Sequence, residues 1–181
     1  GVSRAGALTY DGVTMTQVTG AVFGAGVSAE MWYLVNPTVS SSTKIRVPNS
    51  GGLNIRVIAS SYTGVNYVAV DKFATRALSN ANVSTTLTTT LKDVVVDIMV
   101  HELSTAETGR SDTLLFATDE GQWNTAAQYK LQTVLGTTTL SHTIGADAWA
   151  IISTAFRPNP PQGPNNGATF ANGGGIDLAW T

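Results

Sequence analysis

The two histidines of the chain, His101 and His142, are the residues best suited to metal binding or acid–base chemistry. Carboxylates lie near both of them in the sequence, namely Asp97, Glu102 and Asp147. Zinc takes three or four imidazole, thiolate or carboxylate ligands in a tetrahedral arrangement. Nothing in the spacing of these residues requires them to converge, so we interpret the histidines as exposed residues at strand ends. The sequence therefore predicts no metal site and no cofactor.

A second acidic group, Asp112, Asp119 and Glu120, lies in a region with the composition of a loop. Calcium takes six to eight oxygen ligands, and the alternating D-x-D-x-D pattern that supplies them is absent, so we favour solvated turn residues. Ser111 stands beside Asp112, but the chain has no G-x-S-x-G elbow, and a serine nucleophile needs a base within hydrogen-bond reach. We predict no catalytic residue and expect a protein that is not an enzyme.

Trp123 and Tyr129 are the aromatic residues with the most polar sequence surroundings, in the stretch DEGQWNTAAQY. An exposed tryptophan among amide side chains would stack on a sugar ring. The other interpretation is that Trp123 anchors a loop or fills a contact between subunits. Trp32 and Trp149 lie in strongly apolar stretches and are predicted core residues. A glycan site at Trp123 and Tyr129 therefore remains the alternative to a structural role.

The end of the chain combines a stiff linker with an apolar tail. Residues 158–167 contain four of the six prolines, which favours an extended linker. In the tail, residues 168–181, the side chains of Ile176, Leu178 and Trp180 alternate as they would in a strand. Such a strand would pair with the sheet of a neighbouring subunit or fold back on its own domain. The sequence leaves these two alternatives open.

Four strong patterns define the elements that would position these residues. Residues 27–37 carry bulky apolar side chains on both faces of an extended chain, which predicts an inner strand around which the other strands are arranged. Residues 93–103 and 147–156 predict two further core strands. Asp11-Gly12 stands between two alternating runs, a pattern typical of a tight hairpin. Strands and turns therefore dominate the chain.

The remaining patterns are weaker. Residues 53–64 predict another long strand, and residues 137–144 a short one. Residues 71–91 are rich in threonine, which argues against a helix, and we expect a loop with one strand at residues 83–87. The total is roughly nine to eleven short strands with few helix signals. The sequence thus predicts an all-β fold, an antiparallel β-sandwich or jelly roll.

Composition agrees with one domain, residues 1–157, followed by the linker and tail. Of the 181 residues 43% are hydrophobic and only 12% are charged, about half the usual share. A surface covered by neighbouring subunits needs few solubilising charges. The net charge of −2 gives no reason to expect nucleic-acid binding, and no apolar run reaches the roughly 20 residues of a membrane helix. The chain has no cysteine, which excludes disulfides.

Five segments of the chain form a recognisable series. They are LTYDGVTMTQV (8–18), AEMWYLVNPT (29–38), IASSYTGVN (58–66), DVVVDIMV (93–100) and DAWAIISTAF (147–156). In this order and spacing they resemble a β-sandwich module of phage virion and tail proteins and of bacterial extracellular surface proteins. The family has no known catalytic residues that could be transferred to this chain.

The resemblance implies a non-enzymatic structural subunit of an extracellular or virion assembly, such as a phage capsid or tail decoration or a fibre component. It also implies a location outside the cell or on the virion surface. The expected partners are copies of the same chain or other structural subunits. The alternative is a carbohydrate-binding or adhesin module, whose partners would be glycans.

Overall fold

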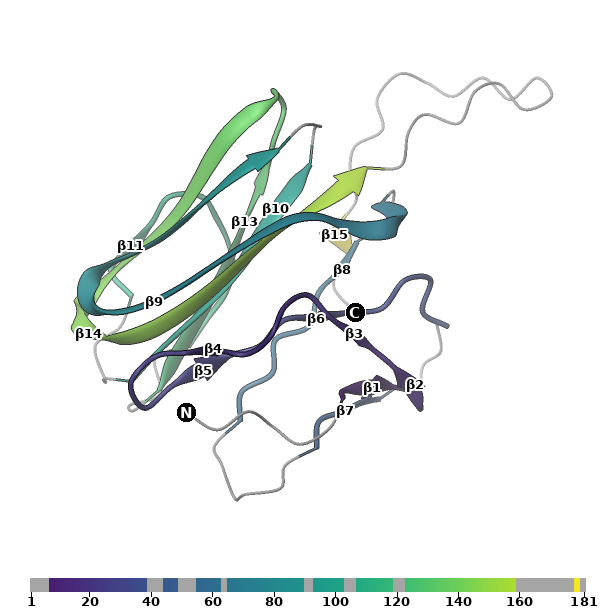
Figure 1. Cartoon of the computed structure of the whole chain (residues 1–181), viewed down its shortest axis with the longest axis horizontal. Coiled ribbons are helices and arrows are strands. Elements are labelled where there is room, and N and C mark those ends of the chain that lie inside the picture. The colour runs from purple at the N-terminus through teal and green to yellow at the C-terminus, as the bar shows by residue number, and fades with distance from the viewer. Residues whose placement is uncertain are drawn as a thin grey trace.

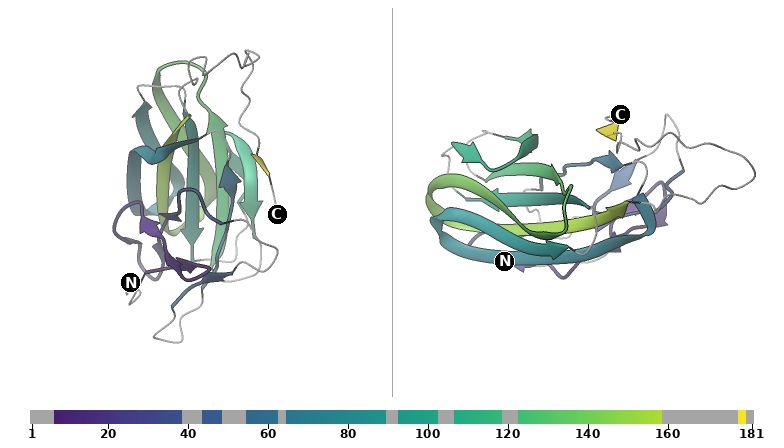
Figure 2. Two further views of the ribbon diagram at one scale, coloured as in Figure 1. Left: turned by 90° about the vertical axis from the view of Figure 1, so that its right-hand side faces the viewer. Right: turned by 90° about the horizontal axis from the view of Figure 1, so that it is seen from above.

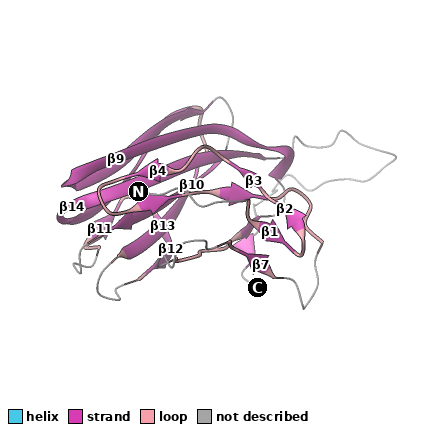
Figure 3. Cartoon of the chain, turned by 60° about the horizontal axis from the view of Figure 1, so that its bottom comes forward, coloured by secondary structure: helices cyan, strands magenta, loops and turns pink. Residues whose placement is uncertain are grey.

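The structure is a computed structural model that describes residues 7–38, 44–48, 55–62, 65–89, 93–102, 107–118, 123–158 and 178–179. Within these ranges the chain forms strands and loops and no helix (Figure 3). The same ranges contain no helix that is long and apolar enough to cross a membrane. All strand pairs are antiparallel. The predicted all-β antiparallel fold is confirmed, while the strand order does not establish a jelly roll.

The two longest strands of the sandwich are β9 (Val65–Thr89) and β14 (Gly136–Pro158). They pair along almost their whole length, with a register shift between Thr143 and Asp147. At that irregularity the paired strands fold over, so that their two halves lie in facing layers (Figures 1 and 2). Extra residues on one strand of a pair bend it sharply, which explains the position of the fold.

The other main strands extend this ribbon into a six-stranded sheet. β10 (Val94–His101) lies between β14 and β13 (Asn124–Leu131) and is paired on both sides. The sheet order is β11-β14-β10-β13-β12, with β9 also paired to β14. The remaining strands of this sheet are β11 (Gly109–Arg110) and β12 (Thr113–Ala117). The prediction of a core strand within residues 93–103 is confirmed.

Each face of the sheet is covered by a different part of the chain. Between the layers, Met99 of β10 packs with Trp149 and Val83, all fully buried. On the opposite face, Val27 and Ala29 pack against Ala150 and Ile152 of β14. The covering segment contains the short strands β4 (Val22–Phe23) and β5 (Ser28–Ala29), which cross that face in Figure 1. β10 therefore needs apolar side chains on both of its faces.

The prediction that residues 27–37 form the inner strand of the sheet is wrong. This segment forms two short strands, β5 and β6 (Trp32–Tyr33), which pair with β4 and β3 (Thr16–Gln17). Trp32 is only half-buried and donates a hydrogen bond to Glu30. Both sides of β10 are occupied by β13 and β14, so the apolar segment packs across the sheet instead. A dense apolar pattern predicts burial, but it does not give the position of a segment within the sheet.

The prediction of a loop in residues 71–91 is also wrong, because β9 runs without interruption to Thr89. Its threonine-rich half alternates strictly: Thr85, Leu87 and Thr89 are buried, and the residues between them are exposed. The exposed threonines pair with threonines of β14, for example Thr86 with Thr139 at 2.9 Å between hydroxyl oxygens. β-Branched residues suit such a half-buried strand.

Two smaller predictions need correction and one is confirmed. A long strand was predicted at residues 53–64, but within the described residues 55–62 only β8 (Ser61–Tyr62) is a strand. The two strands predicted at residues 137–144 and 147–156 are a single strand, β14. The hairpin at Asp11-Gly12 is present, with φ of 49° and 82°, as a primed turn requires. It joins β1 (Thr9–Tyr10) and β2 (Val13–Thr14), and β7 (Ile45–Arg46) pairs with β1.

Candidate functional site: a buried carboxylate–imidazole network

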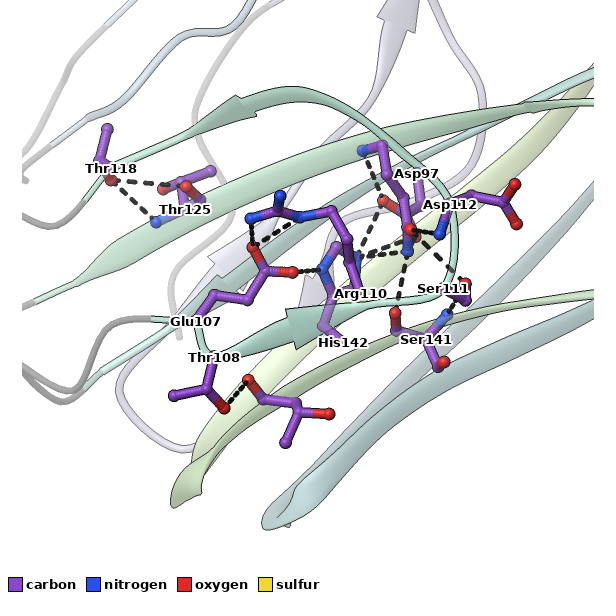
Figure 4. Close-up of polar contacts among 12 residues, drawn as sticks. Asp97, Glu107, Thr108, Arg110, Ser111, Asp112, Thr118, Thr125, Ser141 and His142 are labelled. Carbon is purple, nitrogen blue, oxygen red and sulfur yellow. Dashed lines mark hydrogen bonds and ion pairs between the residues drawn. The ribbon is translucent and has the colours of Figure 1, made fainter.

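Polar side chains from several strands meet in the space between the two layers. Asp97 of β10 lies opposite Gln128 of β13 in the register, and both are fully buried. His142 reaches the same place from the folded-over half of β14, and Glu107 arrives from the loop before β11 (Figure 4). These residues are far apart in the sequence and meet only because β14 folds over the sheet.

His142 is held between two carboxylates. Its Nδ1 lies 2.6 Å from Glu107 Oε1, and its Nε2 lies 3.0 Å from Asp97 Oδ2. Burial alone would lower the pKa of His142, but the hydrogen bonds and negative charges of Asp97 and Glu107 outweigh burial and raise the pKa to about 9. The ring is therefore an imidazolium at neutral pH, and both of its N–H groups donate to carboxylates.

Arg110 supplies the second positive charge of the network. Its Nη2 and Nε donate to Glu107 Oε2 at 2.5 and 3.1 Å. Burial favours a higher pKa for Glu107, but the hydrogen bonds from His142 and Arg110 together outweigh burial and hold its pKa below the ordinary value. The carboxyl groups of Asp97 and Glu107 thus face the buried His142, and Arg110 pairs with Glu107 from the exposed side of the network. Buried ions are tolerated when they are paired and hydrogen-bonded in this way.

Gln128 connects this ion group to the turn between β11 and β12. Its backbone N–H and side-chain Nε2 donate to the two oxygens of Asp97 at 3.1 and 2.9 Å. Its Oε1 accepts from the Asp112 backbone N–H at 2.9 Å and from Ser111 Oγ at 3.5 Å. Ser111 Oγ in turn accepts from the backbone N–H of Ser141 on β14 at 3.0 Å. A single set of side chains therefore ties together four strands and one turn.

The hydrogen bonds of this network are better suited to holding the strands together than to proton transfer. A general base needs a free lone pair near the proton that it removes. Both ring nitrogens of His142 face carboxylates, and Ser111 contacts Gln128 and Ser141 instead of a base. The predicted candidates Asp97 and His142 therefore do meet, but as an ion pair inside the sandwich.

The other histidine, His101, lies in a separate buried pair. Its Nδ1 is 3.1 Å from Asp147 Oδ2, and Asp147 Oδ1 accepts the Ala148 backbone N–H at 2.6 Å. His101 is 1% exposed, and its Nε2 has no hydrogen-bond partner within the described residues. The prediction that both histidines are exposed is therefore wrong, because His101 lies on the inner face of β10 and the fold of β14 brings His142 between the layers. Among the described residues, no group of three or more histidines and acidic residues could hold a metal ion.

A third buried charged group was not predicted from the sequence. Arg157 donates to Asp71 Oδ1 through Nε, at 2.8 Å, and through Nη2. Asp93 is 1% exposed, and neither of its carboxylate oxygens has a hydrogen-bond partner in the described part of the chain. Burial, followed by the charge of Asp71, raises the pKa of Asp93 to about 6, although Arg157 acts in the opposite direction. No sequence spacing signals this group, because its members come from three different strands or strand ends.

The two aromatic candidates lie toward opposite ends of β13. Trp123 precedes β13, is half-buried, and packs against the cluster that contains Val27 and Ala29. Its backbone has φ of 63° and donates a hydrogen bond to the Glu102 carbonyl at 2.9 Å. Tyr129 lies six residues along the chain, roughly 20 Å away in an extended strand, and is also half-buried. The contacts of Trp123 are those of a loop anchor.

The acidic and C-terminal candidates are only partly described. Asp112 forms an ion pair with Lys130 at 3.2 Å, while Asp119 and Glu120 lie outside the described residues. The same is true of most of the predicted linker and tail, including Ile176 and Trp180. Leu178 belongs to β15 (Leu178–Ala179), which pairs antiparallel with β8 of the same chain, where Leu178 lies opposite Tyr62.

Comparison with other proteins gives no relative. No family model, no curated protein and no solved structure matches this chain. The resemblance of five segments to phage and bacterial surface modules therefore stays a prediction.

Proposed function

We propose that the chain is a non-enzymatic structural subunit of an extracellular or virion assembly, such as a capsid or tail decoration or a fibre component. It would act by packing and strand pairing with copies of itself. The observation that carries this proposal is the antiparallel pairing of the tail strand β15 with β8. The pairing lies within one chain, as in the alternative in which the tail folds back on its own domain. It supports the proposal because the tail of a second copy would take the same place on β8 if the tails were exchanged.

The docking place of the tail is built from main-chain and aromatic contacts. β8 pairs with β15, and the ring of Tyr62 stacks on Phe156 of β14 with centroids 5.7 Å apart. Nineteen residues separate Pro158 from Leu178, and such a length spans roughly 60 Å when fully extended. The tail of one copy can therefore reach β8 of a neighbour in the same register. Strand exchange of this kind joins subunits with contacts that a single chain already makes.

The surface composition also supports assembly. Only 12% of the residues are charged, and several large apolar side chains are exposed, among them Val134 at 70%, Leu135 at 65% and Val57 at 51%. Such side chains are normal when they are scattered singly, but a charge-poor surface has little to oppose association. A subunit surrounded by copies of itself would cover much of this apolar area.

The proposal is tested by removing the tail and measuring mass. Deleting residues 159–181 keeps Pro158, which pairs with Val65, and is expected to reduce the mass found by light scattering. In the full chain, Leu178→Asp should also reduce the mass, because it places a charged side chain opposite Tyr62. Ser79→Asp adds the same charge to an exposed position of β9 and serves as the control. An oligomer that survives both tail changes would contradict exchange of the tail.

A further inference from the structure

β12 is the last strand of the six-stranded sheet on the side of β13. Its inner edge pairs with β13, and among the described residues no strand pairs with its outer edge. Two of its large apolar side chains are exposed, Leu114 at 42% and Phe116 at 38%. A strand with an open, apolar edge presents unpaired main-chain groups to any strand that can align with it.

The two exposed side chains lie on opposite faces of the sheet. Leu114 is opposite Gln128, whereas Phe116 is opposite Ala127, because a register shift separates the two positions. Gln128 and Ala127 are adjacent on β13, so their side chains point to opposite faces. A partner lying on one face would cover only one of the two apolar groups. An added strand would flank both of them.

The absence of charge together with exposed large apolar side chains distinguishes this edge from the others. β12, with the sequence TLLFA, contains no charged residue. The short edge strand β11 carries Arg110, and the first half of β9 carries the exposed Lys72 and Arg76. Charges of this kind are a common protection of sheet edges against pairing. The second half of β9 is also uncharged, but its exposed residues there, Thr86 and Thr88, are polar. The acidic residue next to β12, Asp112, is neutralised by Lys130 at 3.2 Å.

We propose that β12 pairs antiparallel with β12 of a second copy, which joins the two sheets across a two-fold axis. The inference rests on the proposed self-assembly but uses a different edge from the tail. A second copy is the occupant that fits, since it brings an equally uncharged strand with apolar side chains on both faces. A two-fold contact also uses this one strand on both subunits. Because the bulge in β12 shortens the regular ladder, the contact is weak alone and contributes mainly within a larger assembly.

The test is a concentration series of the full chain by sedimentation velocity. Phe116→Lys and Leu114→Lys place a positive charge on either face of the edge and should each weaken association at least tenfold. Phe73→Lys, at an apolar position of β9 that is 50% exposed, is the matched control and should associate as the native chain does. Circular dichroism of all variants checks that they remain folded, which is expected because all three side chains reach solvent.

The results separate this inference from the exchange of the tail. Association that survives deletion of residues 159–181 and is lost in Phe116→Lys supports the β12 contact alone. Association that is lost on the deletion but unchanged in both lysine variants of β12 overturns the β12 contact and leaves the tail in place. Equal weakening in Phe73→Lys and Phe116→Lys would also overturn the inference, because charge and not position would then explain the effect.

Discussion

At the scale of single residues, the group around His142 pairs three buried side chains with one another and with Arg110 at the exposed side. The imidazolium satisfies Asp97 and Glu107, and Arg110 balances the second carboxylate. Such a group contributes no more to the free energy of unfolding than apolar side chains of the same shape would. Removal of one partner, however, leaves an uncompensated buried charge and lowers that free energy. The contribution of each member to stability therefore depends on the presence of the others.

The first prediction concerns Asp97. Asp97→Ala is expected to lower the free energy of unfolding by about 3–5 kcal/mol, because His142 and Gln128 would lose their buried acceptor. Asp112→Ala removes an acid whose partner Lys130 is partly exposed and should lower it by less than about 1 kcal/mol. Urea denaturation measures both values. Equal losses in the two variants would contradict a special role of the buried network.

The second prediction is a dependence of stability on pH. The pKa of His142 is raised from its ordinary value of 6.5 to about 9 in the folded chain. The folded chain therefore retains this proton while the unfolded chain loses it, and the free energy of unfolding should fall as pH rises from 6.5 to about 9. In His142→Gln this decline should be absent. A native stability that stays level or rises over this window would contradict the imidazolium assignment.

The third prediction is that a substitution of Asp93 raises the stability of the fold. Because burial and Asp71 raise the pKa of Asp93 from 3.8 to about 6, ionisation of Asp93 opposes folding above that pH. Asp93→Asn should therefore be more stable than the native chain at pH 8 and similar to it at pH 4. Thermal unfolding at the two pH values measures the difference. Asp11→Asn, at an exposed turn, is the control and should show no such gain. A less stable Asp93→Asn at pH 8 would contradict the assignment.

The sequence predicted only part of these sites. It named Asp97, His142, His101 and Asp147 as candidates, but placed both histidines at the surface. It did not indicate Gln128 at all. A strand pattern shows which side chains share a face, but it does not show that a distant half of β14 folds over that face. Contacts between the layers could not be predicted for this reason.

At the scale of elements, the paired strands β9 and β14 determine the architecture. Trp149 marks their bend, since its ring is fully buried between the layers and its Nε1 donates to the Asn80 carbonyl at 3.0 Å. The bend lies where Thr143 and Asp147 of β14 pair with Asn82 and Asn80 of β9. One side chain therefore both fills the core and holds the irregular part of the ribbon.

The fourth prediction tests this role of Trp149. Trp149→Ala is expected to lower the free energy of unfolding by about 3–5 kcal/mol, through lost burial and the cavity left behind. Trp149→Phe keeps an aromatic ring and mainly loses the hydrogen bond to Asn80, which contributes about 1 kcal/mol. Chemical denaturation measures both. A similar loss in both variants would show that the hydrogen bond, and not the packing of the ring, holds the bend.

The sequence predicted strands better than it predicted their arrangement. The hairpin at Asp11-Gly12, the strand β10 and the second half of β14 were predicted from local patterns, because turn chemistry and apolar runs are local signals. The threonine-rich part of β9 was missed, because its polar residues are satisfied by threonines of β14 across the ladder. The segment at residues 27–37 was placed inside the sheet, although it covers one face.

At the scale of the whole molecule, the sandwich combines a closed interior with open edges. Ion pairs and apolar clusters fill the space between the layers, while β8 accepts the tail and β12 ends the sheet without a charged residue. The proposed exchange of the tail and the proposed β12 contact would join copies in two ways. Repetition of two weak contacts in a symmetric array would give a stable assembly.

The most direct test of this account is the mass of the full chain in solution, measured by light scattering over a range of concentrations. We expect a species heavier than the 18.9 kDa monomer, which becomes lighter when residues 159–181 are removed or when Phe116→Lys is introduced. A full chain that remains a monomer at every concentration would contradict a role in assembly through copies of itself.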